Sequence, residues 1–337
     1  MSAKKSRRDN ISVPAAQPSA PAEHTEKTPV PAAPWQGCCG EGVFSRKDTL
    51  MVVLYSVLLL LSMTVQTGTV SMILCVLALL GKKPLSRFEQ RLSVPVLGLL
   101  AFAIVYGASA IYSPFGANAQ SEFYKFIAAF SLAVILLARF ERKHVPGLLW
   151  GGASVSAVIA LISLDMSCGQ VLFWPFNALM NALGTDYTGA LQESVAARVG
   201  GLYSDANVTA CLFSLALFMA LYLLKNSTCI WRRLAASLLA GVNAVSLLLT
   251  GSRGALLCFA VACLVWLLLE RADRVGLLLL LLETAVTMLA AGIPASSMVS
   301  SADETVVLLC LFSGLILFAL DAVAGRRLDS VLSTHKK

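Results

Sequence analysis

Apolar runs close to 20 residues long follow one another between residues 48 and 324. A helix of that length crosses a hydrocarbon layer about 30 Å thick. No water in that layer can satisfy backbone N–H and C=O groups, so each run must be helical. Charged residues make up only 13% of the chain, against about 25% in soluble domains. We therefore predict an all-α, polytopic transmembrane helical bundle.

The runs predict about ten membrane spans, of which some are short and the others long enough to cross the membrane. They cover residues 48–63, 67–80, 92–111, 123–140, 145–164, 205–224, 234–250, 254–269, 275–293 and 305–324. The first two are short, and we place a turn between them at Gln66–Gly68, because one helix over 48–80 would put two basic flanks on opposite sides of the membrane. Residues 1–47 are polar and rich in proline and alanine, which predicts a disordered cytoplasmic tail. Residues 325–337 are predicted to be a short basic cytoplasmic tail.

Lysine and arginine set the predicted orientation. With the N-terminus inside, 23 of the 26 lysines and arginines fall at the inner face. They lie before residue 48, in 81–91, 139–143, 225–233 and 271–274, and after 325. Cytoplasmic loops of membrane proteins carry this excess, so we predict that both termini are cytoplasmic. The net charge of +7 is thereby spread over short loops, which argues against nucleic acid as a partner.

The outer side retains three cations, Lys125, Arg198 and Arg253. Basic residues are scarce in outer loops, so a cation retained there is well placed to bind an anion. Arg198 falls in the longest outer segment, at about residues 165–204, which is too long to be a plain connector. Its role is the central question that the sequence raises.

The long outer segment is predicted to have two parts. Residues 171–180 are apolar and are expected to lie along the outer leaflet. Residues 188–199 are predicted to form a short helix, in which Leu191, Val195 and Arg198 share one face. Arg198 would then point with the apolar stripe toward membrane or protein. The alternative is an arginine that snorkels to the lipid headgroups.

The stretch from Arg198 to Asn207 has the composition of an anion site. Gly200 and Gly201 permit a tight bend and close approach of the backbone. Ser204 and Asp205 are natural N-caps for the span that follows. That span starts at the outer face, where the free N–H groups of a helix N-terminus favour an anion. Simple helix capping explains the two N-cap residues equally well, but it does not explain Arg198.

A second stretch, Leu249–Gly254, ends one span and starts the next at the outer face. Ser252 can cap the new helix, which puts Arg253 in its first turn. A cation beside the positive end of the helix dipole is unfavourable by a few tenths to about 1 kcal/mol, and a bound anion would reverse that sign. Two arginines and two helix N-termini can hold a diphosphate by charge-assisted hydrogen bonds. The alternative is that Arg253 anchors the helix at the lipid headgroups.

Polar residues inside the spans are few. Glu283 lies mid-span, where an acid is costly and suggests a function, or else pairs with a polar group on a neighbouring helix. Asn243 is expected to join helices by hydrogen bonding. The nine cysteines show no ligand spacing, and we predict no metal site.

At the two outer stretches the chain resembles the O-antigen ligase and polymerase superfamily of bacterial membrane glycosyltransferases, which use polyprenyl-diphosphate-linked sugars. The family pattern has an outer arginine, then a glycine and a Pro-Asn pair that opens a helix. A helix that ends in Thr-x-Ser-Arg-Gly follows later. Arg198, Gly201, Asn207 and Thr250–Gly254 match this pattern in order and spacing, and Ala206 stands in place of the usual proline.

The resemblance covers roughly residues 50–270 and implies a donor site. Both arginines, Arg198 and Arg253, are implied to contact the donor diphosphate. The supporting residues are Gly201, Asp205, Asn207 and Ser252. The implied partners are a polyprenyl-diphosphate-linked glycan and the lipid bilayer, and no cofactor is implied.

One departure from the family concerns the catalytic base. The family usually has a second large outer loop that carries a catalytic histidine, whereas the corresponding connection here is short, at about Pro294–Glu304. The only histidines are His24, His144 and His335, all assigned to the cytoplasmic side. The chain is therefore expected to be a truncated, divergent or catalytically silent member. The remaining candidates for a base are Asp186, Glu193, Asp205, Asp303 and Glu304.

The favoured hypothesis is a glycosyltransferase of cell-surface polysaccharide assembly at the outer face of the bacterial plasma membrane. Metal is unnecessary in this hypothesis, because the arginines supply positive charge, and the chain has no Asp-x-Asp sequence. A second hypothesis is a non-catalytic relative that binds lipid-linked glycan. The third, a transporter, ranks last, because transporters use inverted repeats and polar mid-membrane sites.

Overall fold

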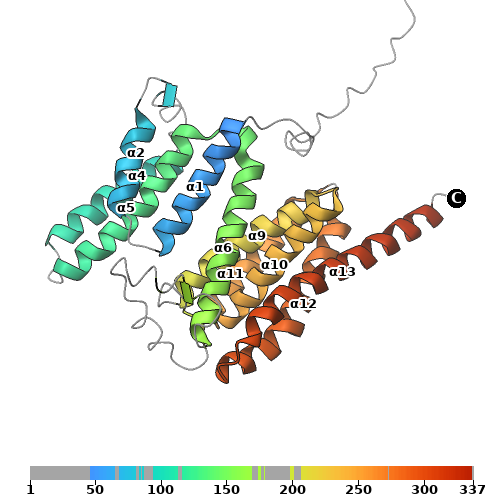
Figure 1. Cartoon of the computed structure of the whole chain (residues 1–337). Helices are drawn as coiled ribbons and strands as arrows, with labels where there is room; N and C mark the ends of the chain where they lie inside the picture. The colour runs from blue at the N-terminus through green and yellow to red at the C-terminus, as the bar shows by residue number, and fades with distance from the viewer. Residues whose placement is uncertain are drawn as a thin grey trace, which may run out of the picture.

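The computed structural model describes residues 46–64, 68–80, 94–112, 116–168, 198–200, 206–271 and 273–335, together with Lys83, Pro84, Ser86, Trp174, Pro175 and Ala178. Within these residues the protein is helical and has no strands (Figure 1). The long helices are α1 (Arg46–Thr64), α2 (Gly68–Leu79), α4 (Val94–Tyr112), α5 (Gly116–Arg139), α6 (Val145–Ser167), α9 (Ala206–Asn226), α10 (Ile230–Leu249), α11 (Arg253–Leu269), α12 (Arg274–Ser300) and α13 (Thr305–His335). They coincide with the ten apolar runs, which confirms the all-α prediction.

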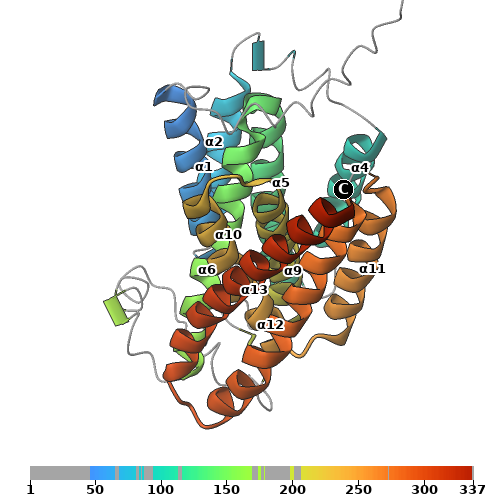
Figure 2. The same ribbon diagram turned by 90° about the vertical axis from the view of Figure 1, so that its right-hand side faces the viewer.

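The described helices form two groups. In the first, α2 and α4 pack against α5, while α1 lies mainly against α6. In the second, α10 lies at the centre and contacts α6, α9, α12 and α13 (Figures 1 and 2). Most of the buried apolar side chains belong to this second group. The second group therefore forms the packed frame that carries the stretches around Arg198 and Arg253.

Five helices are long and apolar enough to cross a membrane. They are Arg142–Ser167, which is α6 with the preceding 3₁₀ turn, and then α9, α10, α12 and the Thr305–Ala324 part of α13. The apolar stretch of α11, Arg253–Leu269, is shorter. Many large apolar side chains on the outside of these helices are exposed, which is the surface that lipid covers in a membrane protein.

Close helix contacts in the second group depend on small and polar residues. A Cβ atom added to Gly241 of α10 would lie 2.3 Å from the backbone nitrogen of Gly314 in α13. The Ser156 hydroxyl donates to Oδ1 of Asn243 at 2.6 Å, which joins α6 to α10. The expected interhelical role of Asn243 is thus confirmed. Small residues and interhelical hydrogen bonds are the usual means of packing helices in lipid.

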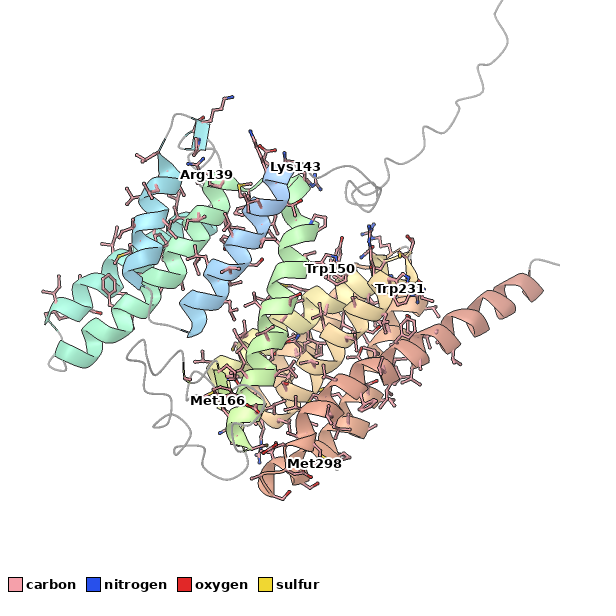
Figure 3. All side chains as sticks on the ribbon, viewed as in Figure 1. Arg139, Lys143, Trp150, Met166, Trp231 and Met298 are labelled. Carbon is pink, nitrogen blue, oxygen red and sulfur yellow. The ribbon has the colours of Figure 1, made fainter. Side chains whose placement is uncertain are left out.

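The two ends of the bundle differ in charge. At one end, here called the basic end, Lys143 pairs with Asp48 and Lys225 pairs with Asp273. Arg139 lies at the same end and donates to carbonyl groups of the last turn of α2. The opposite end, here called the loop end, holds Met166 near the end of α6 and Met298 near the end of α12 (Figure 3). The described parts of the predicted cytoplasmic segments 139–143, 225–233 and 271–274 thus lie at one end of the helices.

Two segments differ from their predicted form. Helix α12 continues through Pro294 to Ser300, so its connection to α13 is Ser301–Glu304, shorter than the predicted Pro294–Glu304. Helix α13 continues to His335, so most of the segment expected as a basic tail is helical. A change from apolar to basic residues ends an apolar run, but it does not end a helix, because lysine and arginine are good helix formers. Residues 1–45 of the predicted tail 1–47 lie outside the described residues, whereas Arg46 and Lys47 belong to α1. Gln66 and Thr67 of the predicted turn also lie outside them, and Gly68 begins α2.

Candidate functional site

The two stretches that were predicted to lie at the outer face, around Arg198 and Arg253, lie against each other at the loop end. The Val199 N–H donates to the carbonyl of Leu249, the last residue of α10, at 3.0 Å. Nε of Arg198 donates to the carbonyl of the next residue, Thr250, at 2.9 Å. Adjacent residues of two distant segments are therefore joined by one backbone–backbone bond and one side chain–backbone bond. The sequence predicted that these stretches act together, and the structure brings them together.

Asn207 connects the two stretches. Its Oδ1 atom accepts a hydrogen bond from the Ser252 hydroxyl at 2.9 Å and a longer one from Nη2 of Arg198 at 3.4 Å. Asn207 is the second residue of α9, and Ser252 is the N-cap of α11. The first turns of α9 and α11 and the Arg198 side chain therefore converge on one amide oxygen. We call Arg198, Asn207, Thr250 and Ser252 the arginine cluster.

Ser252 caps α11 as predicted. Its Oγ accepts from the N–H of Ala255 at 3.4 Å while its hydroxyl proton goes to Asn207. A serine hydroxyl supplies one donor together with acceptor lone pairs, so both bonds form at once. Ser252 is 3% exposed, which protects these bonds from competition with water. The capping residue is therefore also a structural member of the arginine cluster.

Gly251 shapes the turn between α10 and α11. Its φ of +62° is in the left-handed region, which only glycine enters without cost. Its N–H donates to the Leu248 carbonyl at 3.0 Å, as expected for a glycine that ends a helix. A Cβ atom here would also lie 3.2 Å from Cγ of Arg198. Glycine is thus required both for the turn and for the close approach of the arginine.

Arg253 is the first residue of α11, and its side chain is exposed. Within the described part of the chain it forms no hydrogen bond or ion pair through its guanidinium group. Arg198 donates to a carbonyl and an amide oxygen, both neutral acceptors. Neither arginine is paired with a described carboxylate, so no described carboxylate offsets the positive charge of either. The turn that carries Arg253 is the turn that Arg198 contacts.

One prediction about Arg198 is wrong. The helix expected over residues 188–199 does not reach Arg198–Gly200, which are not helical. Backbone pairing with the end of α10 holds this segment instead, and the Thr209 hydroxyl donates to the Gly200 carbonyl at 2.6 Å. The helical spacing of apolar residues did not predict this irregular segment. Gly200 and Gly201 come directly after it, and such glycines favour irregular backbone. The rest of that predicted helix, and residues 171–173, lie outside the described residues.

Several predicted site residues also lie outside the described residues, namely Gly201, Asp205, Asp186 and Glu193. Asp303 is described, and its Oδ1 atom accepts from the N–H of Thr305 at 2.9 Å and from the Thr305 hydroxyl at 2.8 Å. These hydrogen bonds lower the pKa of the Asp303 carboxyl. A carboxylate that is stabilised in this way is a weaker base. Asp303 is therefore a poor candidate for the catalytic base.

Asp165 is a residue at the loop end that the sequence did not single out. It is fully buried in the last turn of α6. Burial, followed by the charges of Asp165, Asp303 and Glu304, raises the pKa of Cys168 to about 11. The α12–α13 connection therefore lies beside the end of α6. Asp165 follows an apolar run directly, and a carboxylate at the edge of a predicted loop gives no signal of burial.

Helix register places Asp165 near the level of the arginine cluster. Gly152 of α6 faces Met219 of α9, and these helices run in opposite directions. Ser156 of α6 bonds to Asn243 of α10, and these run in the same direction. All helices rise by the same distance per residue. Asp165 therefore lies at about the level of Ala206, the first residue of α9, and at about the level of Ser252. A buried carboxylate thus lies at the depth of the cluster.

Glu283 lies on α12 away from the loop end. The Arg233–Asp321 ion pair, which joins α10 to α13, lies near its carboxylate. Its Oε2 atom is buried and has no hydrogen-bond partner in the described part of the chain. The residue is therefore close to a polar group of neighbouring helices without bonding to it. In the same part of the chain no group of three or more histidine, cysteine, aspartate or glutamate side chains could hold a metal ion.

No protein-family model matches the chain, and no curated protein or solved structure matches it. The function is therefore argued from the arginine cluster and the helices that carry it. The cluster offers charged donors, two helix N-termini and a neutral hydrogen-bonding frame. That combination is suited to binding an anionic group with several oxygens.

Proposed function

We propose that the chain crosses the plasma membrane of a bacterium ten times, with both termini in the cytoplasm and the arginine cluster at the outer face. The ten helices coincide with the ten apolar runs, and five satisfy the length and composition of a span. The gathering of Arg139, Lys143 and Lys225 at one end supports this orientation, since lysine and arginine concentrate in cytoplasmic loops.

Cysteine labelling tests the orientation. Cys229 is exposed and lies just before α10 on the basic end. Hydrogen bonds from the backbone of Arg232 and Trp231 lower the pKa of its thiol, which raises its thiolate fraction near neutral pH. In a variant without other cysteines, a membrane-impermeant maleimide should label Cys229 only after the membrane is opened. Cysteine placed at Ser301 should react in intact cells, and the opposite pattern would exclude this orientation.

We propose that the protein is an O-antigen ligase-like glycosyltransferase that moves a glycan from a polyprenyl diphosphate to an acceptor. The observation that carries this proposal is that Arg198 and Arg253 have no described carboxylate partner at the loop end, although their neighbours bind Arg198 through neutral atoms. Arginines that keep their charge beside two helix N-termini favour a phosphate-rich ligand. A lipid-linked diphosphate reaches this depth from the outer leaflet.

The chemistry follows from the placement of charge. An acceptor hydroxyl attacks the anomeric carbon of the donor sugar, and the bond from that carbon to the diphosphate oxygen breaks. Negative charge develops on the departing diphosphate, where two guanidinium groups stabilise it. The acceptor proton passes to a base that none of the described residues identifies. Asn207 and Ser252 act by positioning Arg198 and the start of α11.

Exchange of Arg253 tests the proposed function. Arg253→Ala should reduce glycan transfer by about 100-fold or more, the usual effect of removing a donor that stabilises transition-state charge. Arg253→Lys should restore part of it, because lysine keeps the charge but not the bidentate geometry. Arg274→Ala is the matched control, since Arg274 is also the first residue of a helix but lies at the basic end. Unchanged transfer by Arg253→Ala would refute the proposal.

A second candidate is a non-catalytic relative that binds lipid-linked glycan. The position of His144 at the basic end and the capping role of Asp303 favour this candidate, because both remove a possible base from the loop end. Turnover of a purified lipid-linked donor separates the two functions. Binding that depends on Arg198 without any transfer would support the second candidate.

A further inference from the structure

The basic end contains a cavity of about 360 Å³, at the lower end of the range of about 300–1,000 Å³ for ligand pockets. Four segments of the chain form it: the start of α1, the residues after α2, the end of α5 and the turn before α6. Its charged and polar lining consists of Asp48, Lys83, Arg139, Glu141, Lys143 and His144. We call it the inner cavity. Its lining residues Arg139 and Lys143 lie at the end of the helices opposite to Met166 and Met298 (Figure 3).

The carboxylates of the inner cavity are already engaged. Nζ of Lys143 lies 3.3 Å from Oδ2 of Asp48 and 3.8 Å from Oε2 of Glu141. Nδ1 of His144 accepts the N–H of Glu141 at 2.9 Å, so its Nε2 carries the proton and donates to Oδ1 of Asp48 at 3.1 Å. His144 is therefore neutral in this arrangement. Lys143 offsets one of the two carboxylates, and the whole lining, with two carboxylates against three cations, keeps a net charge of +1.

Two cations of the inner cavity, Arg139 and Lys83, form no ion pair with a described carboxylate. Arg139 donates through Nε and Nη2 to the carbonyls of Leu77, Ala78 and Leu80. A guanidinium has five N–H groups, and Nη1 of Arg139 has no partner among the described residues. Lys83 is exposed and forms no ion pair with any described carboxylate. The cavity therefore offers fixed donors from Arg139 and an adaptable ammonium group from Lys83.

We propose that the inner cavity binds a phosphate group, either that of an anionic lipid of the inner leaflet or free phosphate. The rigid placement of Arg139 on the carbonyls of α2 limits the entropy that binding would cost. Basic pockets between transmembrane helices on the cytoplasmic side are suited to phosphate headgroups. The proposal rests on membrane insertion and on these contacts, and it is independent of glycan transfer.

Thermal unfolding in detergent tests the proposal, because a ligand that binds the native state raises the midpoint. The probes are dihexanoyl phosphatidic acid, dihexanoyl phosphatidylcholine and inorganic phosphate, each with the full chain. Phosphatidic acid should raise the midpoint and phosphatidylcholine should not. Lys83→Gln should weaken the apparent affinity for phosphatidic acid by about five-fold, the effect of one surface cation on an anionic lipid. Lys47→Gln, an exposed lysine near the start of α1, should leave it unchanged.

The outcomes separate the two sources of phosphate. Stabilisation by phosphatidic acid alone identifies a lipid headgroup, and an equal effect of inorganic phosphate identifies the free anion. Both results require that Lys83→Gln weakens the effect more than Lys47→Gln does. Equal responses of the wild type and Lys83→Gln would overturn the proposal, and so would equal effects of the two lipids together with no effect of inorganic phosphate. Because Lys83 has no partner among the described residues, its exchange leaves the fold intact and the test stays decisive.

Discussion

The two ends of the bundle hold their cations in different ways. At the basic end Lys143, Lys225 and Arg233 each lie within ion-pair distance of a carboxylate. At the loop end Arg198 is bound by the oxygens of Thr250 and Asn207, which carry no formal charge. Ion pairing at the basic end reduces the positive electrostatic field of these cations, whereas the neutral acceptors at the loop end do not reduce the field of Arg198.

We infer from the difference that basic side chains serve two purposes in this chain, joining helices at one end and attracting an anion at the other. A cation paired with a carboxylate joins helices, and it has little attraction left for a ligand. A cation held by neutral oxygens is positioned without being neutralised, so its field remains available to an anion. The inner cavity combines both cases, since Lys143 is paired there while Arg139 binds only carbonyls. The predictions below test whether this distinction governs function and stability.

The largest effect is expected from removing the positioned charge. Arg198→Ala should lower glycan transfer by about 10²–10³-fold, because a charge-stabilising donor is lost. Arg198→Lys should lie between Ala and wild type, since lysine lacks the two-sided contact with Thr250 and Asn207. Transfer from a purified lipid-linked donor is the measurement. Equal activity of the Ala and Lys variants would show that charge at this position plays no part.

The fold was largely predictable from the sequence. Helix positions follow from apolar length, because a run that enters lipid has no alternative to helix. The ends of α12 and α13 were predicted less well, since Pro294 and the basic residues after 325 are tolerated inside helices. Proline in a spanning helix is accommodated by neighbouring groups, and a sequence does not show these neighbours.

The candidate site was only partly predictable. Arg198 and Ser252 were singled out from charge placement and capping, and Asn207 from the family resemblance, and these three are joined by hydrogen bonds. The way in which Arg198 is held was not predictable, because it depends on backbone pairing between Val199 and Leu249. Such pairing between distant segments has no periodic signal. Asp165 was missed for the same reason, since its burial results from packing.

A second effect, on the stability of the fold, is expected from breaking the Arg233–Asp321 ion pair near the basic end of α10. Arg233→Ala leaves Asp321, whose side chain is 17% exposed, without its cation. The cost should be about 1–3 kcal/mol, between that of exposed and of buried ion pairs. The double variant Arg233→Gln/Asp321→Asn should recover part of it, because neither charge then remains unpaired. Thermal unfolding in detergent measures both, and transfer activity per folded molecule should stay unchanged.

The comparison of Gly251 with Gly254 sharpens the role of the turn. Gly251→Ala should destabilise by about 1–2 kcal/mol, the cost of a left-handed residue with a side chain, and should weaken transfer by displacing Arg198. Gly254→Ala is the control, because a Cβ atom there meets nothing within 4 Å. Alanine in the first turn of α11 should be neutral or slightly stabilising. Equal unfolding midpoints for the two variants would contradict the turn argument.

The smallest effect is expected from a half-exposed pair at the basic end. Lys225, whose side chain is 15% exposed, lies 2.8 Å from Asp273, whose side chain is 54% exposed, and 3.9 Å from Glu270. Lys225→Ala should cost about 0.2–1 kcal/mol, and the difference from wild type should shrink in 1 M salt, where the screening length is about 3 Å. Asp273→Ala should cost more and keep its cost in salt, because Asp273 also caps α12 by accepting from Gly276 at 2.9 Å. A salt-independent loss in Lys225→Ala would mean that this cation acts by packing, and pairing would then not distinguish the basic end from the loop end.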